Sequence, residues 1–105
     1  MTQKVEIKAP SDQGTITVKG CVAWFYIGDE RHKFLIQDTK VSEKFLTHYK
    51  SGMKLKSTAP IKLANMRSYK RLTEREAARL TLESIIAKHG IERVQNIIKQ
   101  APIIN

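Results

Sequence analysis

The residues of this chain that could do chemistry are mostly cations, and they are concentrated in the middle of the sequence. Residues 31–75 carry twelve Lys or Arg against three acids, a net +9, while residues 1–30 contribute −1 and residues 76–105 contribute +1. Charge that served only solubility would be spread along the chain. A local excess of this size attracts a polyanion or an acidic partner. The pattern favours binding over catalysis.

Aromatic residues are interleaved with these cations. In a β-hairpin that turns at residues 51–52, Tyr49 lies opposite Lys54. In the same register Thr47 lies opposite Lys56, on a face that points away from the core. Cations neutralise backbone phosphates and release counterions, and aromatic rings stack on unpaired bases. The predicted face therefore has the composition of a surface that binds single strands.

The candidate nucleic-acid-binding residues extend from this hairpin into the segment that follows it. They are cations that would contact phosphates and tyrosines that would stack on bases: Lys50, Lys54, Lys56, Lys62, Arg67, Lys70, Arg71, Arg75, Tyr49 and Tyr69. We expect a nucleic-acid ligand, with single-stranded DNA or RNA favoured, bound with low sequence specificity. The alternative hypothesis is a protein-interaction adaptor whose basic face docks an acidic protein.

Trp24 and Tyr26 occupy the second face of a central hairpin. A four-residue loop at residues 28–31 pairs Ile27 with His32, which places Trp24 opposite Leu35. Large apolar side chains on both faces imply that something covers the second face. The C-terminal helices, a second copy of the chain or the bases of a ligand could do so. We expect burial within the monomer, with a homodimer interface or a stacking platform as the alternatives.

Residues typical of catalytic or metal sites are few and scattered. His32, His48, His89 and Cys21 fall in different predicted elements and lack the spacing of metal ligands. The sequence contains no Gly-rich phosphate loop, nucleophile elbow or HExxH motif. We therefore expect no enzymatic activity, no catalytic residues, no metal and no cofactor.

The elements that would position these residues begin as strands. Two-residue alternation of apolar side chains predicts strands around residues 5–7 and 16–18, and a β-branched and aromatic run predicts another at residues 21–27. Residues 41–49 fit either a helix that ends at Gly52 or the first strand of a hairpin. We favour the hairpin, because aromatic and β-branched residues dominate this segment.

The C-terminal third is predicted to be helical. Thr73 and Glu76 have the spacing of a capping box, and Gly90 stands where a helix of this length would end. A second short helix would then run until Pro102. The chain is therefore predicted to be a single α+β domain over residues 1–105, with an antiparallel sheet of four to five strands followed by one or two C-terminal helices packed on it. Its parts are strand-rich residues 1–58, a connection at residues 59–71 and helical residues 72–101.

This order of strands and helices, with a basic β-ribbon, resembles the architecture of a family of single-strand-binding transcriptional coactivators. The resemblance is confined to the arrangement of elements, because the chain has no diagnostic motif of that family. A helix-turn-helix centred on residues 88–91 is disfavoured, because its recognition helix would carry little net charge.

Composition indicates the setting in which the protein works. Cys21 is the single cysteine, so no intramolecular disulfide can form. The longest apolar run spans seven residues, 21–27, against the roughly 20 that a membrane-spanning helix needs. The N-terminal residues alternate between charged and apolar side chains and lack the apolar core of a signal peptide. We expect a cytoplasmic protein that does not contact a membrane.

Overall fold

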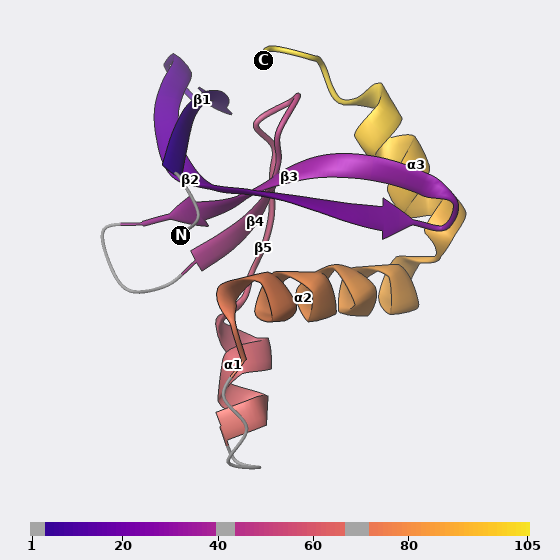
Figure 1. Ribbon diagram of the computed structural model, residues 1–105. Coiled ribbons are helices and arrows are strands. Elements are labelled where there is room, and N and C mark those ends of the chain that lie inside the picture. The colour runs from indigo at the N-terminus through magenta and orange to yellow at the C-terminus, as the bar shows by residue number, and fades with distance from the viewer. Residues whose placement is uncertain (1–3, 40–43, 67–71) are drawn as a thin grey trace.

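The chain folds into a five-stranded antiparallel sheet followed by helices (Figure 1). The computed structural model describes residues 4–39, 44–66 and 72–105. The strands lie in the sheet in chain order, and they are β1 (Lys4–Ser11), β2 (Gly14–Ile27), β3 (Glu30–Asp38), β4 (Lys44–His48) and β5 (Lys54–Ser57). The predicted fold class, an antiparallel sheet followed by C-terminal helices, is confirmed.

The helices are α1 (Ala59–Met66), α2 (Glu74–His89) and α3 (Ile91–Gln100). The predicted capping box starts α2: the Glu76 N–H donates to the Thr73 hydroxyl at 3.1 Å, and the Thr73 N–H donates to the Glu76 carboxylate at 3.4 Å. Gly90, at φ 88°, ends α2 and lets α3 start at once. None of the helices in the described ranges is long and apolar enough to cross a membrane.

The short helix α1 lies in the segment that the sequence predicts as a connection. It fills the first part of residues 59–71, so this connection contains a helix that the sequence does not predict. Eight residues make little more than two turns, which is too short for a helical period to stand out. Pro60 sits in the first turn, where its missing N–H costs no helical hydrogen bond.

The main core lies between one face of the sheet and the helices α2 and α3. Side chains alternate between the faces of a strand, so every second residue of β2 and β3 points to the helices. The buried residues of this core are Ala23, Phe25, Ile27, Phe34, Ile36, Leu46, Ala78, Leu82, Val94 and Ile98. The helices therefore cover the face that carries Phe25, and the opposite face is left for other contacts.

A second, smaller core covers part of that opposite face. β2 pairs with β1 along its first part and with β3 along its second part. In Figure 1, β1 and the start of β2 stand at an angle to the rest of the sheet. Four buried side chains meet there, with Tyr49 packed against them: Ile7, Ala9, Val18 and Leu35. β1 thus covers the far half of the second face and leaves the half near the β2–β3 turn open.

The curl of the sheet brings its first strand against its last hairpin. Gly52 has φ 69°, and a Cβ at this position would lie 2.3 Å from the Lys8 carbonyl oxygen. The C-terminal residues hold the same contact. Asn105 receives a hydrogen bond from the Lys8 N–H at 2.8 Å and donates to the Lys8 carbonyl at 2.8 Å, and its own backbone N–H donates to the Lys50 carbonyl at 2.9 Å.

The β2–β3 hairpin has a tighter turn than the sequence predicts. Ile27 pairs with Glu30 across a two-residue turn, in place of the predicted four-residue loop that pairs Ile27 with His32. Gly28 has φ 65°, a conformation that such tight turns require. The error shifts β3 by two residues, which keeps every side chain on its predicted face but changes its partner. Trp24 is therefore opposite Lys33 instead of Leu35.

The hairpin favoured for residues 44–57 is confirmed, and the helical alternative is wrong. Its predicted register is also wrong: Thr47 pairs with Lys54, and Leu46 pairs with Lys56, with an irregularity between these two pairs. The cause is a longer turn. The His48 N–H donates to the Met53 carbonyl at 2.8 Å, so residues 49–52 form the turn and Tyr49 is its first residue.

Candidate nucleic-acid interface

Aromatic rings and cations alternate across three strands on the face away from α2 and α3. Lys33 of β3 lies between two rings, with its Nζ 5.8 Å from the centre of the Trp24 ring and 3.8 Å from the centre of the Tyr49 ring. Backbone pairing holds this order, because Trp24 is the register partner of Lys33 and the Tyr49 N–H donates to the Lys33 carbonyl at 3.1 Å. The three side chains therefore span β2, β3 and the start of the turn that follows β4.

Arg31 and Tyr26 extend the alternation toward the β2–β3 turn. The Arg31 guanidinium carbon lies 4.5 Å from the centre of the Trp24 ring, and Arg31 is the register partner of Tyr26. Cations over ring faces are attracted by the ring quadrupole, which holds these flexible side chains in place. We call the resulting surface the ring–cation row; its members are Trp24, Tyr26, Arg31, Lys33 and Tyr49.

The predicted burial of Trp24 within the monomer is wrong. Trp24 is 42% exposed and Tyr26 is 66% exposed. The helices cover the other face of β2, and β1 covers only the end of this face where Leu35 is fully buried. No described element lies over the remaining half. The ring–cation row is therefore an open surface of the protein.

The predicted outer face of the β4–β5 hairpin is partly covered. Thr47 is fully buried and donates to the Gln37 side-chain oxygen at 2.8 Å, and Tyr49 is half-buried against the smaller core. Lys54 stays exposed, with its Nζ 4.5 Å from the centre of the Phe45 ring. This hairpin thus adds a second pair of a cation and a ring at the edge of the sheet.

The structure brings together some of the predicted cations and separates others. Lys50, Lys54 and Lys56 are all exposed on the β4–β5 hairpin. Lys62 of α1 forms an ion pair with Glu74 at 2.5 Å and does not belong to this surface. Four of the predicted site residues lie outside the described residues: Arg67, Tyr69, Lys70 and Arg71.

Arg75 connects α2 to the ring–cation row. Its guanidinium donates to the Trp24 carbonyl at 3.5 Å and lies 5.3 Å from the centre of the Phe25 ring. Two carboxylates, Glu74 and Glu76, lie in the first turn of α2, so a bound anion there would be repelled and the start of α2 is a poor anion site. The contribution of α2 to this surface is therefore the Arg75 guanidinium.

Arg31 and Lys33 belong to the ring–cation row but are not among the site residues predicted from the sequence. The signal was present, because a two-residue turn at Gly28 places them opposite Tyr26 and Trp24. The predicted four-residue loop instead paired Tyr26 with Lys33 and left Arg31 in the loop. The wrong register therefore placed Arg31 outside the strand, and the pairs Tyr26–Arg31 and Trp24–Lys33 were not predicted.

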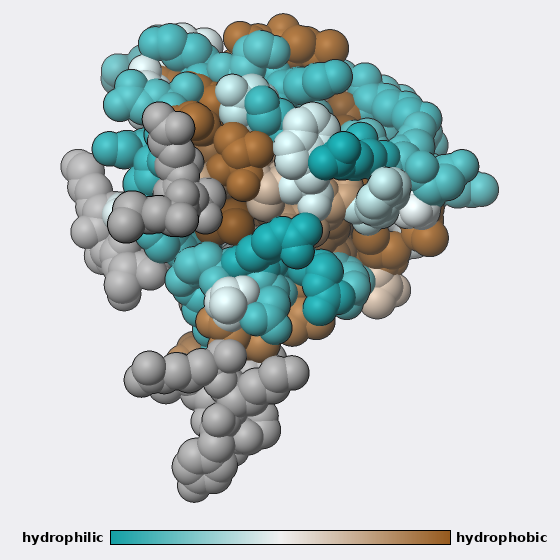
Figure 2. Space-filling view, viewed as in Figure 1, coloured by the Kyte–Doolittle hydropathy of each residue, from teal (hydrophilic) through white to brown (hydrophobic). Residues whose placement is uncertain are grey.

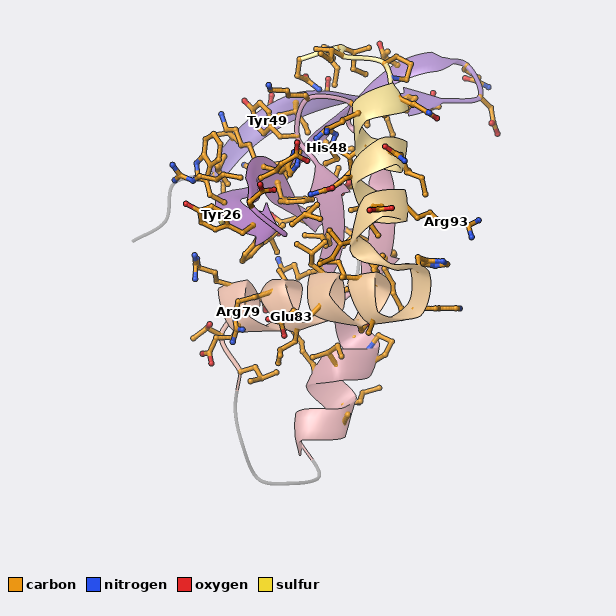
Figure 3. All side chains as sticks on the ribbon, turned by 90° about the vertical axis from the view of Figure 1, so that its right-hand side faces the viewer. Tyr26, His48, Tyr49, Arg79, Glu83 and Arg93 are labelled. Carbon is orange, nitrogen blue, oxygen red and sulfur yellow. The ribbon has the colours of Figure 1, made fainter. Side chains whose placement is uncertain are left out.

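A hollow of about 230 Å³ lies between β2 and α2, at one end of the row. Trp24 and Tyr26 line it from the strand, and Arg75, Arg79 and Glu83 line it from the helix. Arg79 and Glu83 form an ion pair at 2.9 Å. In Figure 3, Tyr49, Tyr26 and Arg79 lie on one side of the molecule, while Arg93 of α3 points to the opposite side.

The surface on this side is hydrophilic with less polar residues between. Figure 2 views the molecule from the side on which Tyr26 and Arg79 lie in Figure 3. Hydrophilic residues lie along α2 and over the β2–β3 hairpin, and pale and brown, more hydrophobic residues lie between them. A mixture of this kind suits a ligand that has both charged and flat apolar parts.

His48 lies on the core face behind the row and takes no part in it. Its Nδ1 is 2.8 Å from the Ser51 hydroxyl oxygen, and its ring centre is 6.2 Å from that of His32. Burial, with smaller contributions from the charges of His32 and Lys50, lowers the pKa of His48 to about 4. His48 is therefore neutral at pH 7 and acts in packing.

Asp38 is the carboxylate that neutralises two cations at the other end of β3. Partial burial alone would raise its pKa, but hydrogen bonds from Lys4 and Lys44 outweigh this effect and hold the pKa of Asp38 below its ordinary value. Lys4 and Lys44 are thus both paired with Asp38. They are not part of the candidate interface.

No group of three or more His, Cys, Asp or Glu side chains that could hold a metal ion occurs in the part of the chain that the structure describes. No protein-family model, no curated protein and no solved structure matches this chain.

Proposed function

We propose that this protein binds single-stranded nucleic acid, DNA or RNA, across the open half of its sheet. The observation that carries the proposal is the position of Lys33 between the rings of Trp24 and Tyr49. In a single strand, bases and phosphates alternate along the chain. Rings that stack on bases and cations that neutralise phosphates match this alternation.

The exposure of the rings supports a single strand over a duplex. Bases in a duplex are stacked on one another and present only their edges in the grooves, so a ring on a sheet cannot stack on them. Tyr26, at 66% exposed, is not needed for the core. The helix α3 would bring little free positive charge to a major groove, because Lys99 is paired with Glu30 at 2.8 Å and Arg93 is next to Glu92.

The number of cations near the row sets the expected strength of binding and its salt dependence. Five of the described cations on or beside the row are Arg31, Lys33, Lys50, Lys54 and Arg75. Each neutralised phosphate of a single strand contributes about −0.7 to the slope of log K against log salt. With about four to five phosphates neutralised, the expected slope is roughly −3 to −4.

The test is a titration of a labelled single strand of about 15 nucleotides, followed by fluorescence anisotropy at salt concentrations from about 50 to 200 mM. The proposal predicts saturable binding with the slope given above, and weaker binding of a duplex of the same length. Heparin controls for simple polyanion attraction. No binding of any oligonucleotide at about 50 mM salt would contradict the proposal and favour an acidic protein as the partner of the same cations.

A further inference from the structure

We infer that the hollow between β2 and α2 holds one nucleotide of the bound strand, with its phosphate on Arg75 and Arg79, and that Glu83 restrains the affinity of this subsite. This inference rests on the proposed function, because it assigns one subsite to the same strand. It adds a phosphate-binding residue, Arg79, and an opposing charge that lie outside the ring–cation row.

The hollow is continuous with the ring–cation row. Trp24 and Tyr26 belong to both surfaces, so a strand that stacks on these rings enters the hollow without crossing a gap. Its volume of about 230 Å³ is smaller than the pockets that enclose drug-sized ligands, and suits one unit of a polymer. In Figure 3 the Arg79 side chain lies on the same side as Tyr26, which fits a path from the sheet onto α2.

The cations of the hollow suit a phosphate group. A guanidinium binds phosphate through two parallel N–H donors, and Arg75 is already positioned by its bond to the Trp24 carbonyl. Arg79 forms an ion pair with Glu83, four residues later on α2. The side chains of Arg79 and Glu83 are 47% and 56% exposed. Exposed pairs of this kind are weak, so a phosphate can compete with Glu83 for the Arg79 guanidinium.

The inference predicts effects of opposite sign at two neighbouring residues. Glu83→Gln removes the competing carboxylate and leaves Arg79 free, so it should tighten single-strand binding by about threefold, the size of one charge interaction in water at about 7 Å. Arg79→Ala removes the phosphate contact, so it should weaken binding by about eightfold at 50 mM salt and about threefold at 200 mM.

Two substitutions on α3 make the same changes in net charge elsewhere. Glu92→Gln and Arg93→Ala alter exposed residues, and Figure 3 shows Arg93 on the side away from Tyr26 and Arg79. The inference predicts that both leave the affinity unchanged within about 1.5-fold, because neither residue lines the hollow and salt weakens interactions between exposed charges that are not in contact. Circular dichroism melts of all four variants check that the fold is intact.

The outcome separates the subsite from the proposed function. Tighter binding by Glu83→Gln but not by Glu92→Gln supports the subsite. If Trp24→Ala weakens binding while Glu83→Gln matches Glu92→Gln and Arg79→Ala matches Arg93→Ala, the proposed function stands and the subsite is wrong. If the unaltered protein binds no single strand, both are wrong.

Discussion

Replacing Lys33 with Met removes the ammonium group between the two rings of the ring–cation row and keeps a similar unbranched stem. The Lys33 Nζ lies 3.8 Å from the centre of the Tyr49 ring and 5.8 Å from that of Trp24, so no other described cation shares this position between the rings. If the row binds a single strand, Lys33→Met should remove one phosphate contact and leave the stacking rings in place.

The expected magnitude follows from counterion release. Each phosphate contact to a single strand multiplies the association constant by a factor that varies as the salt concentration to the power of about −0.7. Relative to 1 M salt, one contact is therefore worth about eightfold in affinity at 50 mM and about threefold at 200 mM. Loss of the contact between Lys33 and the rings should lower the free energy of unfolding by only about 0.5–1 kcal/mol.

The assay is fluorescence anisotropy of a labelled single strand at several salt concentrations. Lys19→Met is the matched control, because Lys19 is an exposed residue of the same strand as Trp24, five positions earlier and therefore on the other face of β2. Lys33→Met should reduce the salt slope by about 0.7, and Lys19→Met should leave the slope unchanged. Thermal melts of both variants confirm that they are folded.

Two results would refute the reasoning. Equal losses in Lys33→Met and Lys19→Met would mean that binding responds to net charge alone. A loss at Lys33 that does not shrink as salt rises would mean that Lys33 supports the structure and does not contact a phosphate.

Three further predictions test the fold that presents the row. Leu82→Ala should lower the free energy of unfolding by about 2–5 kcal/mol in urea titrations, because this side chain is only 2% exposed between α2 and the sheet; a loss below about 1 kcal/mol would mean that α2 is not docked. Gly52→Ala should lower the free energy of urea unfolding more than Gly14→Ala does. Both glycines have positive φ, but of the two only Gly52 would place a Cβ against backbone, 2.3 Å from the Lys8 carbonyl oxygen. Equal losses would argue against the contact between β1 and the last turn. The pKa of His48 is about 4 in the folded protein and 6.5 ordinarily, so between pH 4 and pH 6.5 the unfolded chain binds more protons than the folded one. The free energy of unfolding should therefore be highest above pH 6.5 and should fall by up to about 3 kcal/mol as the pH falls toward 4. His48→Asn should remove that pH dependence of urea unfolding and His89→Asn, at an exposed position, should keep it; the reverse would contradict the assignment.

The order and type of most elements could be predicted because they depend on local signals. Thr73 and Glu76 form the capping box that their spacing predicts, and Gly90 ends the helix. Trp24 and Tyr26 share the second face as predicted, because Ala23, Phe25 and Ile27 lie in the main core on the other face of β2. A two-residue error in pairing left these assignments intact, since side chains on a strand repeat every two residues.

The candidate site could not be predicted in full, because it depends on register and on long-range coverage. One turn residue, Gly28, decides whether Lys33 faces Trp24 or Tyr26, and the sequence around it allows both a two-residue and a four-residue loop. The exposure of Trp24 depends on how far β1 reaches across the sheet, which follows from the curl of the whole sheet. Neither property is encoded in a short window of sequence.

The most direct test of the central claim is the fluorescence of Trp24, which is the one tryptophan in the chain. The free protein should show the red-shifted emission of a partly exposed indole, and a single strand should quench it saturably with the dissociation constant measured by anisotropy. Heparin, which has no bases to stack, should bind without comparable quenching. Emission that is blue-shifted in the free protein and shifts to the red on dilution would indicate that a second copy covers Trp24. Emission that a bound oligonucleotide leaves unchanged, or that heparin quenches equally, would contradict stacking on the ring–cation row.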